Sequence, residues 1–463
     1  MKGLTLQRMA EACGARLTGG VGRETEEVAG IVTDSRRVER GFLFVALPGE
    51  RFDGHDFIPE VFAQGAMAVV SEREVDAPGP CLLVASSRDA LRSIAALYLE
   101  TLGIPVVGIT GSVGKTSTKE MIASVLAQKY RVHKTAENYN NEIGLPLTVF
   151  GLRQEHEIAV LEMGISDFGE MSRLAEIARP DVAVITNIGM CHLKDLGDRD
   201  GVLKAKTEVF DYLKCDATVV LNGDDDKLCT VGRVQGREPV FFGMGEARPD
   251  GAAYTRKQIF ADGVESHGLD GIDFNLHLPG AVHRVHVVVP GGHNVYNAMA
   301  AAAVGLAMGL SEAEICAGIE AARTINGRTN LIPVHDYLVI DDCYNASPTS
   351  VRAALDVLAQ AKGRRIAVLG DMKDLGEQEL QLHYDVGVYA AKKGLHALFA
   401  SGKCAKELVR GVSGHTDGTE VFYFDTKEAL TEALLPFVQA GDTVLVKASH
   451  AMEYPKIVEA LTR

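Results

Sequence analysis

The chain lacks several features that would place it in a specialised class. Its 463 residues include no tryptophan, aromatic residues make up only 6%, and the eight cysteines form no CxxC pair. Cysteines scattered in this way do not suit a zinc knuckle or a disulfide scaffold, and few aromatic rings disfavour a surface that stacks nucleic-acid bases. The longest apolar run, residues 298–310, is shorter than the roughly 18 residues that suggest a membrane span.

Positive charge is scarce as well. Lys plus Arg total 47 against 62 Asp plus Glu, which gives a formal net charge of −15. A nucleic-acid-binding protein usually carries a basic excess that neutralises phosphates, so this class is disfavoured. The first residues carry charges in every short window and include no apolar segment typical of a signal peptide. We therefore expect an acidic, soluble protein of the cytoplasm.

Glycine, in contrast, is abundant, with 48 residues, as expected for many tight strand-to-helix turns. The length corresponds to two to four domains at roughly 100–200 residues each. Three parts are distinguishable, with strands and short helices over 1–86 and alternating strands and helices over 87–332 and 333–463. This alternation predicts parallel sheets covered on both faces. Only residues 239–290, where β-branched residues alternate with polar ones, predict a small antiparallel excursion.

The clearest motif lies where an apolar strand, residues 106–110, meets a glycine-rich loop and then a helix. Its candidate phosphate ligands are Gly111, Ser112, Val113, Gly114, Lys115, Thr116 and Ser117. Glycines let successive backbone N–H groups face one anion, the helix adds its positive end, and the Lys-Thr pair offers a charge and a hydroxyl for Mg²⁺. Ile109 stands where the regular P-loop has glycine, but the strand–loop–helix context still predicts a nucleoside triphosphate site.

Polar residues also follow the next strands of the central part. Glu162 ends the strand at 158–162, where open α/β sheets bind ligands, and His192 follows the strand at 182–187. Three asparagines at 138, 140 and 141 form a turn that could be solvated or could contact a sugar or diphosphate. Taken alone, His192 is equally a packing residue, and the pattern around Lys206 favours a solvated helix face. These residues predict an ATPase-type site with Mg²⁺ and no particular reaction, because many enzymes and switches share a P-loop.

The order and spacing of these motifs resemble the Mur ligase family, the ATP-dependent amide-bond-forming enzymes of peptidoglycan synthesis. The resemblance rests on the phosphate loop at 110–116, the asparagine turn at 138–141, Glu162-Met163-Gly164, His192-Leu193, residues 292–298 and Asn326-Gly327-Arg328. Segments 33–36, 47–57, 341–348, 369–376 and 446–447 resemble the members that add D-alanyl-D-alanine to a UDP-N-acetylmuramoyl-tripeptide. The expected fold class is therefore α/β in three domains: a small α/β N-terminal domain, a central P-loop-type mostly parallel sheet with helices on both faces, and a C-terminal Rossmann-like domain.

The resemblance implies a binding role for each domain. The domain at 1–86 would hold the UDP-linked precursor, assisted by the asparagine turn, through Ser35, Arg36, Gly49, Phe52, Asp53, His55, Asn138, Asn140 and Asn141. The domain at 87–332 would bind ATP through the phosphate loop, Asn297 at the adenine and Arg328 at the phosphates, with Asp342 near the ribose. The domain at 333–463 would meet the incoming dipeptide at Tyr344, Asn345, Lys447 and Ser449.

The resemblance also implies the chemistry. Two Mg²⁺ ions would be held by Thr116, Glu162, His192 and a carbamate on Lys206, and the catalytic residues would be Lys115, Lys206 and His192. The precursor carboxylate would attack the γ-phosphorus of ATP, and the dipeptide amine would then displace phosphate from the acyl phosphate, after closure of the third domain. The family expectation is a monomer.

Departures and alternatives accompany this interpretation. Glu137 and Lys194 replace common family residues and alter local charge only. Ala448 and His450 stand where the family carries Gly and Arg, which weakens the expected anchor for the dipeptide carboxylate, since neutral histidine is a poorer partner than arginine. The alternatives are a sister or folylpolyglutamate-type ligase that adds a single amino acid and, in a different class, a P-loop nucleotide switch.

Overall fold

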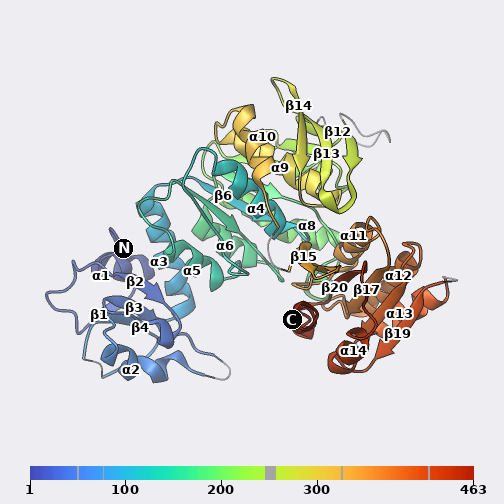
Figure 1. Cartoon of the computed structure of the whole chain (residues 1–463). Helices are drawn as coiled ribbons and strands as arrows, with labels where there is room; N and C mark the ends of the chain where they lie inside the picture. The colour runs from blue at the N-terminus through green and yellow to red at the C-terminus, as the bar shows by residue number, and fades with distance from the viewer. Residues whose placement is uncertain (50–51, 77, 246–256, 325–326, 416–417) are drawn as a thin grey trace.

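The computed structural model describes residues 1–49, 52–76, 78–245, 257–324, 327–415 and 418–463. The described residues form three sheets of five, nine and six strands in chain order. In Figure 1 the N-terminal part, in blue, and the C-terminal part, in orange and red, lie on either side of the central part. None of the described helices is long and apolar enough to cross a membrane.

The first sheet has the order β1-β5-β4-β3-β2, and only β1 and β5 pair in antiparallel fashion. Its strands are β1 (Arg16–Thr18), β2 (Gly30–Val32), β3 (Phe42–Val45), β4 (Ala68–Ser71) and β5 (Cys81–Leu83). Helices α1 (Leu6–Cys13) and α2 (Ile58–Ala63) belong to this part, and α3 (Ser87–Leu102) leads out of it. One hydrophobic core runs from Leu4 and Leu43 through Leu91 and Ile94 of α3 to Leu161. Helix α3 therefore attaches the first sheet to the second through a shared core.

The central sheet has the order β14-β13-β12-β11-β10-β9-β6-β8-β7. Its strands are β6 (Val106–Thr110), β7 (Val132–Lys134), β8 (Ile158–Glu162), β9 (Val182–Ile185), β10 (Thr218–Asn222), β11 (Val240–Met244), β12 (Ile259–Ser266), β13 (Ile272–His277) and β14 (Val282–Val287). The strands from β7 to β12 run parallel, whereas β13 is antiparallel to both β12 and β14. The antiparallel excursion predicted for residues 239–290 is confirmed for β12 to β14 only, because β11 pairs in parallel with β10 and β12, and these strands all continue the central sheet.

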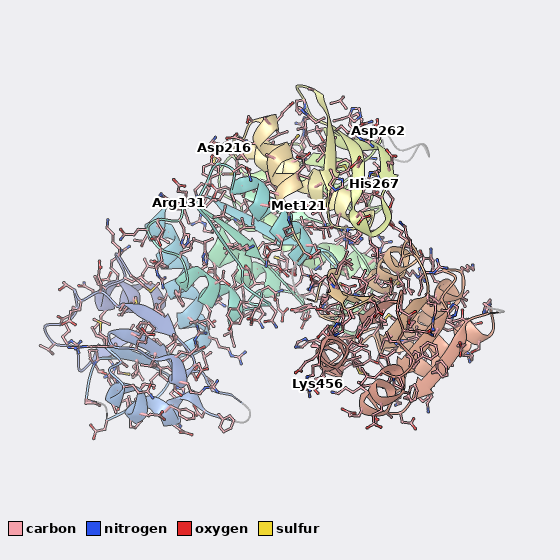
Figure 2. All side chains as sticks on the ribbon, viewed as in Figure 1. Met121, Arg131, Asp216, Asp262, His267 and Lys456 are labelled. Carbon is pink, nitrogen blue, oxygen red and sulfur yellow. The ribbon has the colours of Figure 1, made fainter. Side chains whose placement is uncertain are left out.

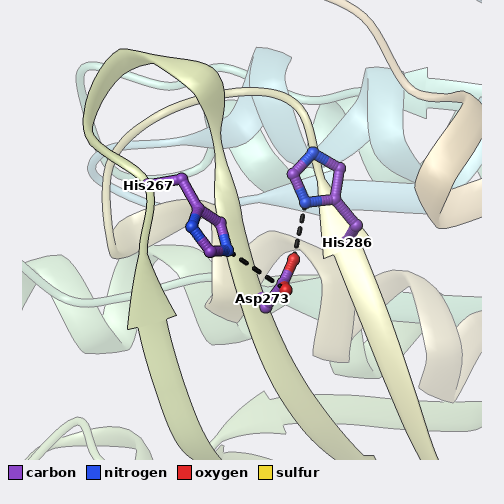
Figure 3. Close-up of side chains that lie close together, drawn as sticks. All are labelled: His267, Asp273 and His286. Carbon is purple, nitrogen blue, oxygen red and sulfur yellow. Dashed lines mark hydrogen bonds and ion pairs between the residues drawn. The ribbon is translucent and has the colours of Figure 1, made fainter.

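Helices cover both faces of the central sheet. They are α4 (Lys115–Leu126), α5 (Gly144–Phe150), α6 (Glu170–Ala178), α7 (Leu193–Leu196), α8 (Arg199–Thr207), α9 (His293–Ala307) and α10 (Glu312–Ala321). Met121 of α4 is buried against the sheet, whereas Asp262 and His267 lie on the ribbon of β12, β13 and β14 (Figure 2). On that ribbon His267, Asp273 and His286 lie close together (Figure 3). The carboxyl ends of β6, β8, β9 and β10 meet at one sheet edge, where α/β proteins bind ligands.

The third sheet has the order β15-β16-β20-β17-β18-β19, with only β15 antiparallel to its neighbour. Its strands are β15 (Asn330–Val334), β16 (Tyr337–Asp341), β17 (Arg365–Gly370), β18 (Ala397–Ser401), β19 (Glu420–Phe424) and β20 (Thr443–Lys447). They alternate with α11 (Pro348–Leu358), α12 (Glu379–Ala391), α13 (Ala405–Ser413), α14 (Lys427–Leu434) and α15 (Pro455–Thr462). The α/β class is confirmed. The domain limits at 86/87 and 332/333 stay predictions, and β15 already begins at Asn330.

Candidate active site

The phosphate loop connects β6 to α4 through a backbone that only glycine accommodates. Gly111 has φ +148°, and a Cβ atom there would lie 2.0 Å from Oγ1 of Thr186. The first N–H groups of α4 have no acceptor within the helix, and Lys115 and Thr116 both line the adjoining cavity. Nζ of Lys115 donates a hydrogen bond of 2.9 Å to the Gly111 carbonyl. The loop thus presents backbone donors, a cation and a hydroxyl on one side.

The end of β9 holds this loop in shape. Oδ1 of Asn187 accepts a 2.9 Å hydrogen bond from the Val113 N–H, and its Nδ2 donates a 2.8 Å bond to the Val113 carbonyl. Oγ1 of Thr186 donates to the same carbonyl over 2.7 Å. The sequence did not lead us to predict these roles of Thr186 and Asn187. Their position at the end of a buried strand beside the phosphate loop was the available signal, because neighbouring parallel strands end at one sheet edge.

Two cavities meet at the phosphate loop, which contributes Val113 and Gly114 to both. The nucleotide cavity has a volume of about 360 Å³ and reaches from the loop to α9 and the third domain. The catalytic cleft has a volume of about 410 Å³ and opens on the side of Glu162 and His192. A larger cavity of about 580 Å³ between α3 and α6 is lined by none of the predicted site residues. The predicted chemistry therefore belongs to the two cavities at the loop.

In the nucleotide cavity, α9 supplies Asn297. Its Oδ1 accepts a 2.8 Å hydrogen bond from Oγ1 of Thr118, and its Nδ2 donates a 2.8 Å bond to Oδ1 of Asn294. A primary amide has two acceptor sites and two donors, so half of its capacity is available to a ligand. Tyr296, from the same helix, also lines this cavity. Asn297 thus lines this cavity with amide groups that can bind a ligand, and its contact with adenine stays a prediction.

The third domain closes the nucleotide cavity with a buried ion pair. Nζ of Lys447 lies 2.6 Å from Oδ2 of Asp342 and also donates to the carbonyl oxygens of Asp342 and Asn345, over 3.2 and 2.9 Å. Oδ1 of Asp342 accepts from the Thr329 N–H over 3.0 Å. Lys447, predicted to contact the dipeptide, thus lines the nucleotide cavity and not the catalytic cleft. All three of its N–H groups are engaged within the protein.

Glu162 is the buried carboxylate of the catalytic cleft. Its Oε1 accepts a 2.9 Å hydrogen bond from Nδ2 of Asn140, while its Oε2 is buried without a hydrogen-bond partner among the described residues. Nζ of Lys119 lies 3.9 Å from that oxygen and donates instead to the Thr135 carbonyl. A buried carboxylate oxygen left without a hydrogen bond requires an explanation. A divalent cation, which prefers carboxylate oxygen, fits this position.

His192 lines the catalytic cleft, whereas Lys206 is buried and does not belong to the residues that line it. Lys206 is 1% exposed, and within the described residues no hydrogen bond or ion pair reaches its Nζ. Burial, together with the charge of Lys115, lowers the pKa of Lys206 to about 8. Burial also lowers the pKa of His192, with contributions from both lysines, which favours the neutral imidazole that binds metals. The expectation from the helix pattern that Lys206 is solvated is wrong, because Lys206 lies on the buried face of α8 with Val202 and Ala205.

Arg328, at the end of the central domain, and residues of the third domain line the other side of the catalytic cleft. Nη2 of Arg328 donates a 3.2 Å hydrogen bond to Oγ1 of Thr116, and its guanidinium lies 3.9 Å from the centre of the Tyr344 ring. Tyr344 and Asn345 line the cleft. Ser449 does not, since it is buried and its Oγ accepts a 2.9 Å hydrogen bond from the Lys373 N–H. The structure thus brings Tyr344 and Asn345 to the cleft and leaves Ser449 beneath it.

The residues predicted to bind UDP lie apart from both cavities, except for Asn140 and Asn141, which line the catalytic cleft. Arg36 is paired with Asp34 at 2.7 Å and its side chain is 85% exposed. Phe52 is also exposed, as is Asn138. Ser35 begins the short helical turn that carries Arg36. Ser35, Arg36 and Phe52 are therefore available to a ligand at the surface of the first domain, whereas Asn138 belongs to the central part of the chain.

His55, in contrast, has a role inside the first domain. Its Nε2 accepts a 2.9 Å hydrogen bond from the Glu72 N–H, so its Nδ1 is the donor to Oδ1 of Asp53 at 2.6 Å. The backbone N–H of His55 also bonds Asp53 and, with the imidazole, holds the pKa of this carboxyl below its usual range. A Cβ atom at Gly49 would lie 2.7 Å from the Phe52 carbonyl. Residues 50 and 51 of the same predicted loop, like Asn326, are outside the described residues.

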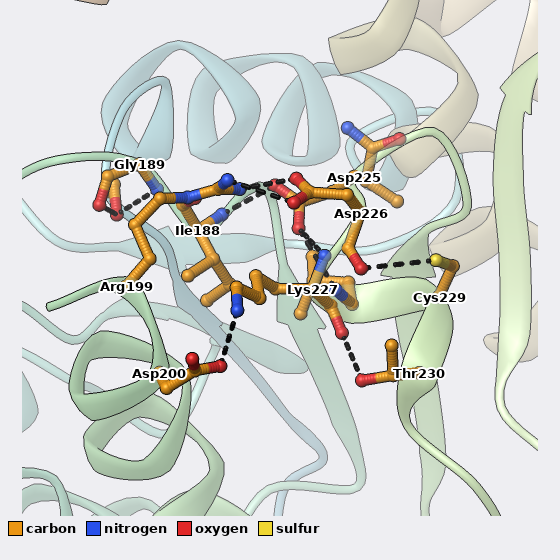
Figure 4. Close-up of polar contacts among 12 residues, drawn as sticks. Ile188, Gly189, Arg199, Asp200, Asp225, Asp226, Lys227, Cys229 and Thr230 are labelled. Carbon is orange, nitrogen blue, oxygen red and sulfur yellow. Dashed lines mark hydrogen bonds and ion pairs between the residues drawn. The ribbon is translucent and has the colours of Figure 1, made fainter.

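A polar network below the nucleotide cavity joins the ends of β9 and β10 (Figure 4). Arg199 of α8 donates from Nε to the Ile188 carbonyl over 2.8 Å and pairs through both Nη atoms with Asp226, at 3.0 and 2.5 Å. Asp225 accepts from the Ile188 N–H over 2.8 Å. Both aspartates line the nucleotide cavity. Arg199 therefore holds this wall of the cavity against the loop that leads to His192.

Replacing Arg199 with methionine should raise the KM for ATP by about threefold to tenfold, with a smaller change in kcat. The variant removes a partly exposed bidentate contact and one hydrogen bond, together worth roughly 1 kcal/mol. Steady-state kinetics with varied ATP measure the effect. Arg233→Met, which removes an exposed ion pair with Glu238, is the matched control. An unchanged KM for ATP would show that the network does not position the cavity wall.

Similarity to known proteins extends along nearly the whole chain. Family models match as the Mur ligase family, catalytic domain, over residues 27–129, the Mur ligase middle domain over 109–305, and the Mur ligase, glutamate ligase domain, over 327–450. A Bacillus subtilis (strain 168) protein named UDP-N-acetylmuramoyl-tripeptide–D-alanyl-D-alanine ligase is 37% identical over 444 residues, which cover 95% of this chain and 94% of that protein.

Solved structures give a matching result. A crystal structure of MurF from Acinetobacter baumannii is 33% identical, with a TM-score of 0.89 and coverage of 99% of this chain and 98% of that one. The MurF ligase from Thermotoga maritima in complex with ADP is 31% identical, with a TM-score of 0.81 and coverage of 94% and 97%.

Proposed function

This chain belongs to the Mur ligase family, and from that membership we propose that it is an ATP-dependent ligase joining D-alanyl-D-alanine to a UDP-N-acetylmuramoyl-tripeptide. The reaction forms an amide bond in peptidoglycan precursor synthesis and releases ADP and phosphate. One observation carries the proposal: a single cleft is lined by the phosphate loop, by Glu162 and His192, and by Tyr344 and Asn345 of the third domain. Activation of a carboxylate by ATP and its capture by an amine need these partners side by side.

The first step transfers the γ-phosphoryl group of ATP to the terminal carboxylate of the tripeptide. Both reactants are anions, so they repel one another at contact distance. Lys115 and Arg328 lie at the phosphate loop, and their charges offset this repulsion and stabilise the charge that develops on the phosphoryl oxygens. Asn297 and the adjoining wall of α9 orient the nucleotide in its own cavity.

The second step is attack of the dipeptide amine on the acyl phosphate, through a tetrahedral intermediate that releases phosphate. Tyr344 and Asn345 lie where the amine must approach, because they form the side of the catalytic cleft that the third domain contributes. Lys447 and Ser449 do not line the cleft. They stabilise the segment that carries Tyr344 and Asn345 through hydrogen bonds to the carbonyl oxygens of Asn345 and Ala346. Closure of the third domain over bound nucleotide precedes chemistry.

The cleft also fits a divalent cation. Glu162 offers a buried oxygen without a hydrogen bond, Thr116 a hydroxyl and His192 a neutral imidazole, and these residues would hold Mg²⁺. Lys206 cannot be a ligand as a free ammonium, but as a carbamate it would present oxygens for a second ion. Mg²⁺, when bound, supplies positive charge to the phosphate oxygens as a Lewis acid.

The UDP part of the precursor binds the first domain through Ser35, Arg36, Gly49 and Phe52. Arg36 keeps donors free beyond those that bond Asp34, and an arginine suits a diphosphate. The exposed ring of Phe52 suits the face of a uracil. Asp53 and His55 hold this loop in shape from inside the first domain. Asn138, Asn140 and Asn141 would contact the precursor where it extends from the first domain to the catalytic cleft. A cytoplasmic location and a monomeric state stay predictions.

A substrate panel tests the function. ADP release should require both the UDP-linked tripeptide and D-alanyl-D-alanine, and mass spectrometry should detect the pentapeptide product. ADP release that required a single free amino acid and ignored the dipeptide would favour a sister or folylpolyglutamate-type ligase. Nucleotide hydrolysis without either peptide substrate, together with no UDP binding, would favour a P-loop switch.

His450 gives a further test of the dipeptide site. Its ring lies 5.7 Å from that of Tyr344, at the position where the resemblance expects arginine. His450→Arg should leave the KM for D-alanyl-D-alanine unchanged or lower it by a few-fold, since a guanidinium is the better partner for a carboxylate. Initial rates with varied dipeptide measure the change, and the KM for the precursor serves as the internal control. A large increase in the dipeptide KM would show that the histidine has its own role.

A further inference from the structure

The ribbon of β12, β13 and β14 carries a cluster of His267, Asp273 and His286 outside both cavities. Asp273 and His286 are cross-strand partners on β13 and β14, and His267 follows directly after β12 in the turn that leads to β13. Gly271 allows this turn, because its φ is +117° and a Cβ atom there would lie 2.4 Å from the Val287 carbonyl. Strand pairing and turn geometry therefore bring the three side chains together from separate parts of the ribbon.

The three side chains point toward a common centre (Figure 3). Nε2 of His267 lies 3.1 Å from Oδ2 of Asp273, and Nδ1 of His286 lies 2.6 Å from Oδ1. One ligand atom from each residue lies within 4.8 Å of the other two. Two ligands of a tetrahedral ion at about 2.0–2.1 Å are about 3.4 Å apart, so small side-chain rotations suffice to enclose an ion.

From this arrangement we propose that His267, Asp273 and His286 bind a divalent transition-metal ion, with Zn²⁺ as the best-suited probe. Two imidazoles and one carboxylate form a donor set that suits Zn²⁺, whereas Mg²⁺ prefers oxygen ligands alone. The side chains are accessible, at 38%, 28% and 41% exposure respectively. Solvent can therefore deliver the ion and complete its coordination.

The neighbouring charges set the affinity of this site. Nη2 of Arg284 lies 3.8 Å from Oδ2 of Asp273, and its positive charge opposes a cation there. The same atom lies 2.9 Å from Oε2 of Glu265, which offsets part of this repulsion. The site is therefore of moderate affinity, and removal of the Arg284 charge should strengthen it.

The cluster lies beside a contact between the central and third domains, so a bound ion would affect that contact. The end of β12 and the turn that follows it contact the third domain. Oγ of Ser266 donates a 2.8 Å hydrogen bond to Oε1 of Gln360, and Leu269 in the turn packs against the core of that domain. A bound ion would tie this turn to β13 and β14. It would thus brace a contact between the central and third domains, at a distance from the catalytic cleft.

Metal titration of the whole protein tests the proposal. Purified, chelator-treated wild type is titrated with Zn²⁺ in excess Mg²⁺ at about pH 7.5, and Co²⁺ absorption reports the ligand geometry. The wild type should bind one more equivalent than the double variant His267→Ala/His286→Ala, and Zn²⁺ should raise the Tm of the wild type only. The comparison subtracts any ion that enters the catalytic cleft.

Two further variants make the result specific. His277→Gln alters another histidine–aspartate pair of the same ribbon, 2.8 Å from Asp262, and should keep the extra equivalent. Arg284→Gln should tighten Zn²⁺ binding several-fold. Circular dichroism verifies that each variant is folded. Equal stoichiometry in wild type and double variant, or loss of the equivalent in His277→Gln as well, would overturn the proposal.

Discussion

Lys115→Ala is expected to reduce ligase turnover by about 10³-fold or more while binding of the UDP-linked precursor stays nearly unchanged. Lys115 is the cation of the phosphate loop. It lines the catalytic cleft, and its Nζ donates a hydrogen bond to the Gly111 carbonyl. Loss of one preorganised group that stabilises developing charge typically costs 10²–10³ in kcat, and here the lost group is also a full charge beside a triphosphate. In the proposed binding mode the UDP part of the precursor contacts a different domain, so the precursor's affinity should not depend on this lysine.

The measurement combines coupled ADP release with calorimetric binding of the precursor. Lys129→Ala is the matched control, because Lys129 follows the same helix and donates to the Gly309 carbonyl far from the phosphate loop. That variant should retain wild-type turnover. Retained activity in Lys115→Ala would contradict the assignment of the phosphate loop, and lost precursor binding would show that the two sites are not independent.

The strands of the central and third domains could be predicted well from sequence. Segments such as Val106–Thr110 and Thr443–Lys447 are short apolar runs buried along their whole length, which is typical of strands in a covered parallel sheet. The phosphate loop was predictable for a related reason, since its glycines, lysine and threonine are consecutive. Local patterns specify such features without reference to distant residues.

Features that depend on distant packing were less accessible. The helix pattern favours a solvated Lys206, yet the side chain is 1% exposed because it lies on the buried face of α8 with Val202 and Ala205. Lys447 was expected at the dipeptide, but the register of β20 against β16 places it beside Asp342 and the nucleotide cavity. His55 was expected at the UDP, and its pairing with the distant Glu72 backbone is invisible in the local pattern.

Net charge was a poor guide to the substrates. A net charge of −15 disfavours a strongly basic protein, yet ATP and the UDP-linked precursor are polyanions and the dipeptide carries a carboxylate. Lys115, Arg328 and Lys206 concentrate positive charge at the cleft instead, and the potential in a cleft depends on such local groups more than on the total. Carbamate formation would replace the positive charge of Lys206 with a negative charge, which makes Lys206 the most informative position in the site.

Lys206→Ala should lower kcat by at least about 10²-fold and be partly rescued by a short-chain carboxylate such as formate or acetate. A carboxylate in the space left by the lysine can supply the oxygens that the carbamate would supply. Lys204→Ala is the matched control, because Lys204 is an exposed residue of the same helix and should be dispensable. An alanine variant that is equally inactive with and without carboxylate, in a folded protein that still binds ATP, would indicate that the lysine acts as an amine.

The pKa of Lys206 makes the carbamate dependent on pH. Only the neutral amine attacks CO₂, and with a pKa lowered to about 8 the neutral fraction rises as the pH increases from about 7 to 9. At constant dissolved CO₂, carbamate occupancy and activity should therefore rise together over this interval, with ¹³C NMR of the labelled protein detecting the carbamate carbon. Depletion of CO₂ and bicarbonate should reduce activity reversibly in the wild type and have no effect on Lys206→Ala rescued by carboxylate. Full wild-type activity without CO₂ would contradict the carbamate, and would leave Glu162 and His192 as the side chains that hold the cation.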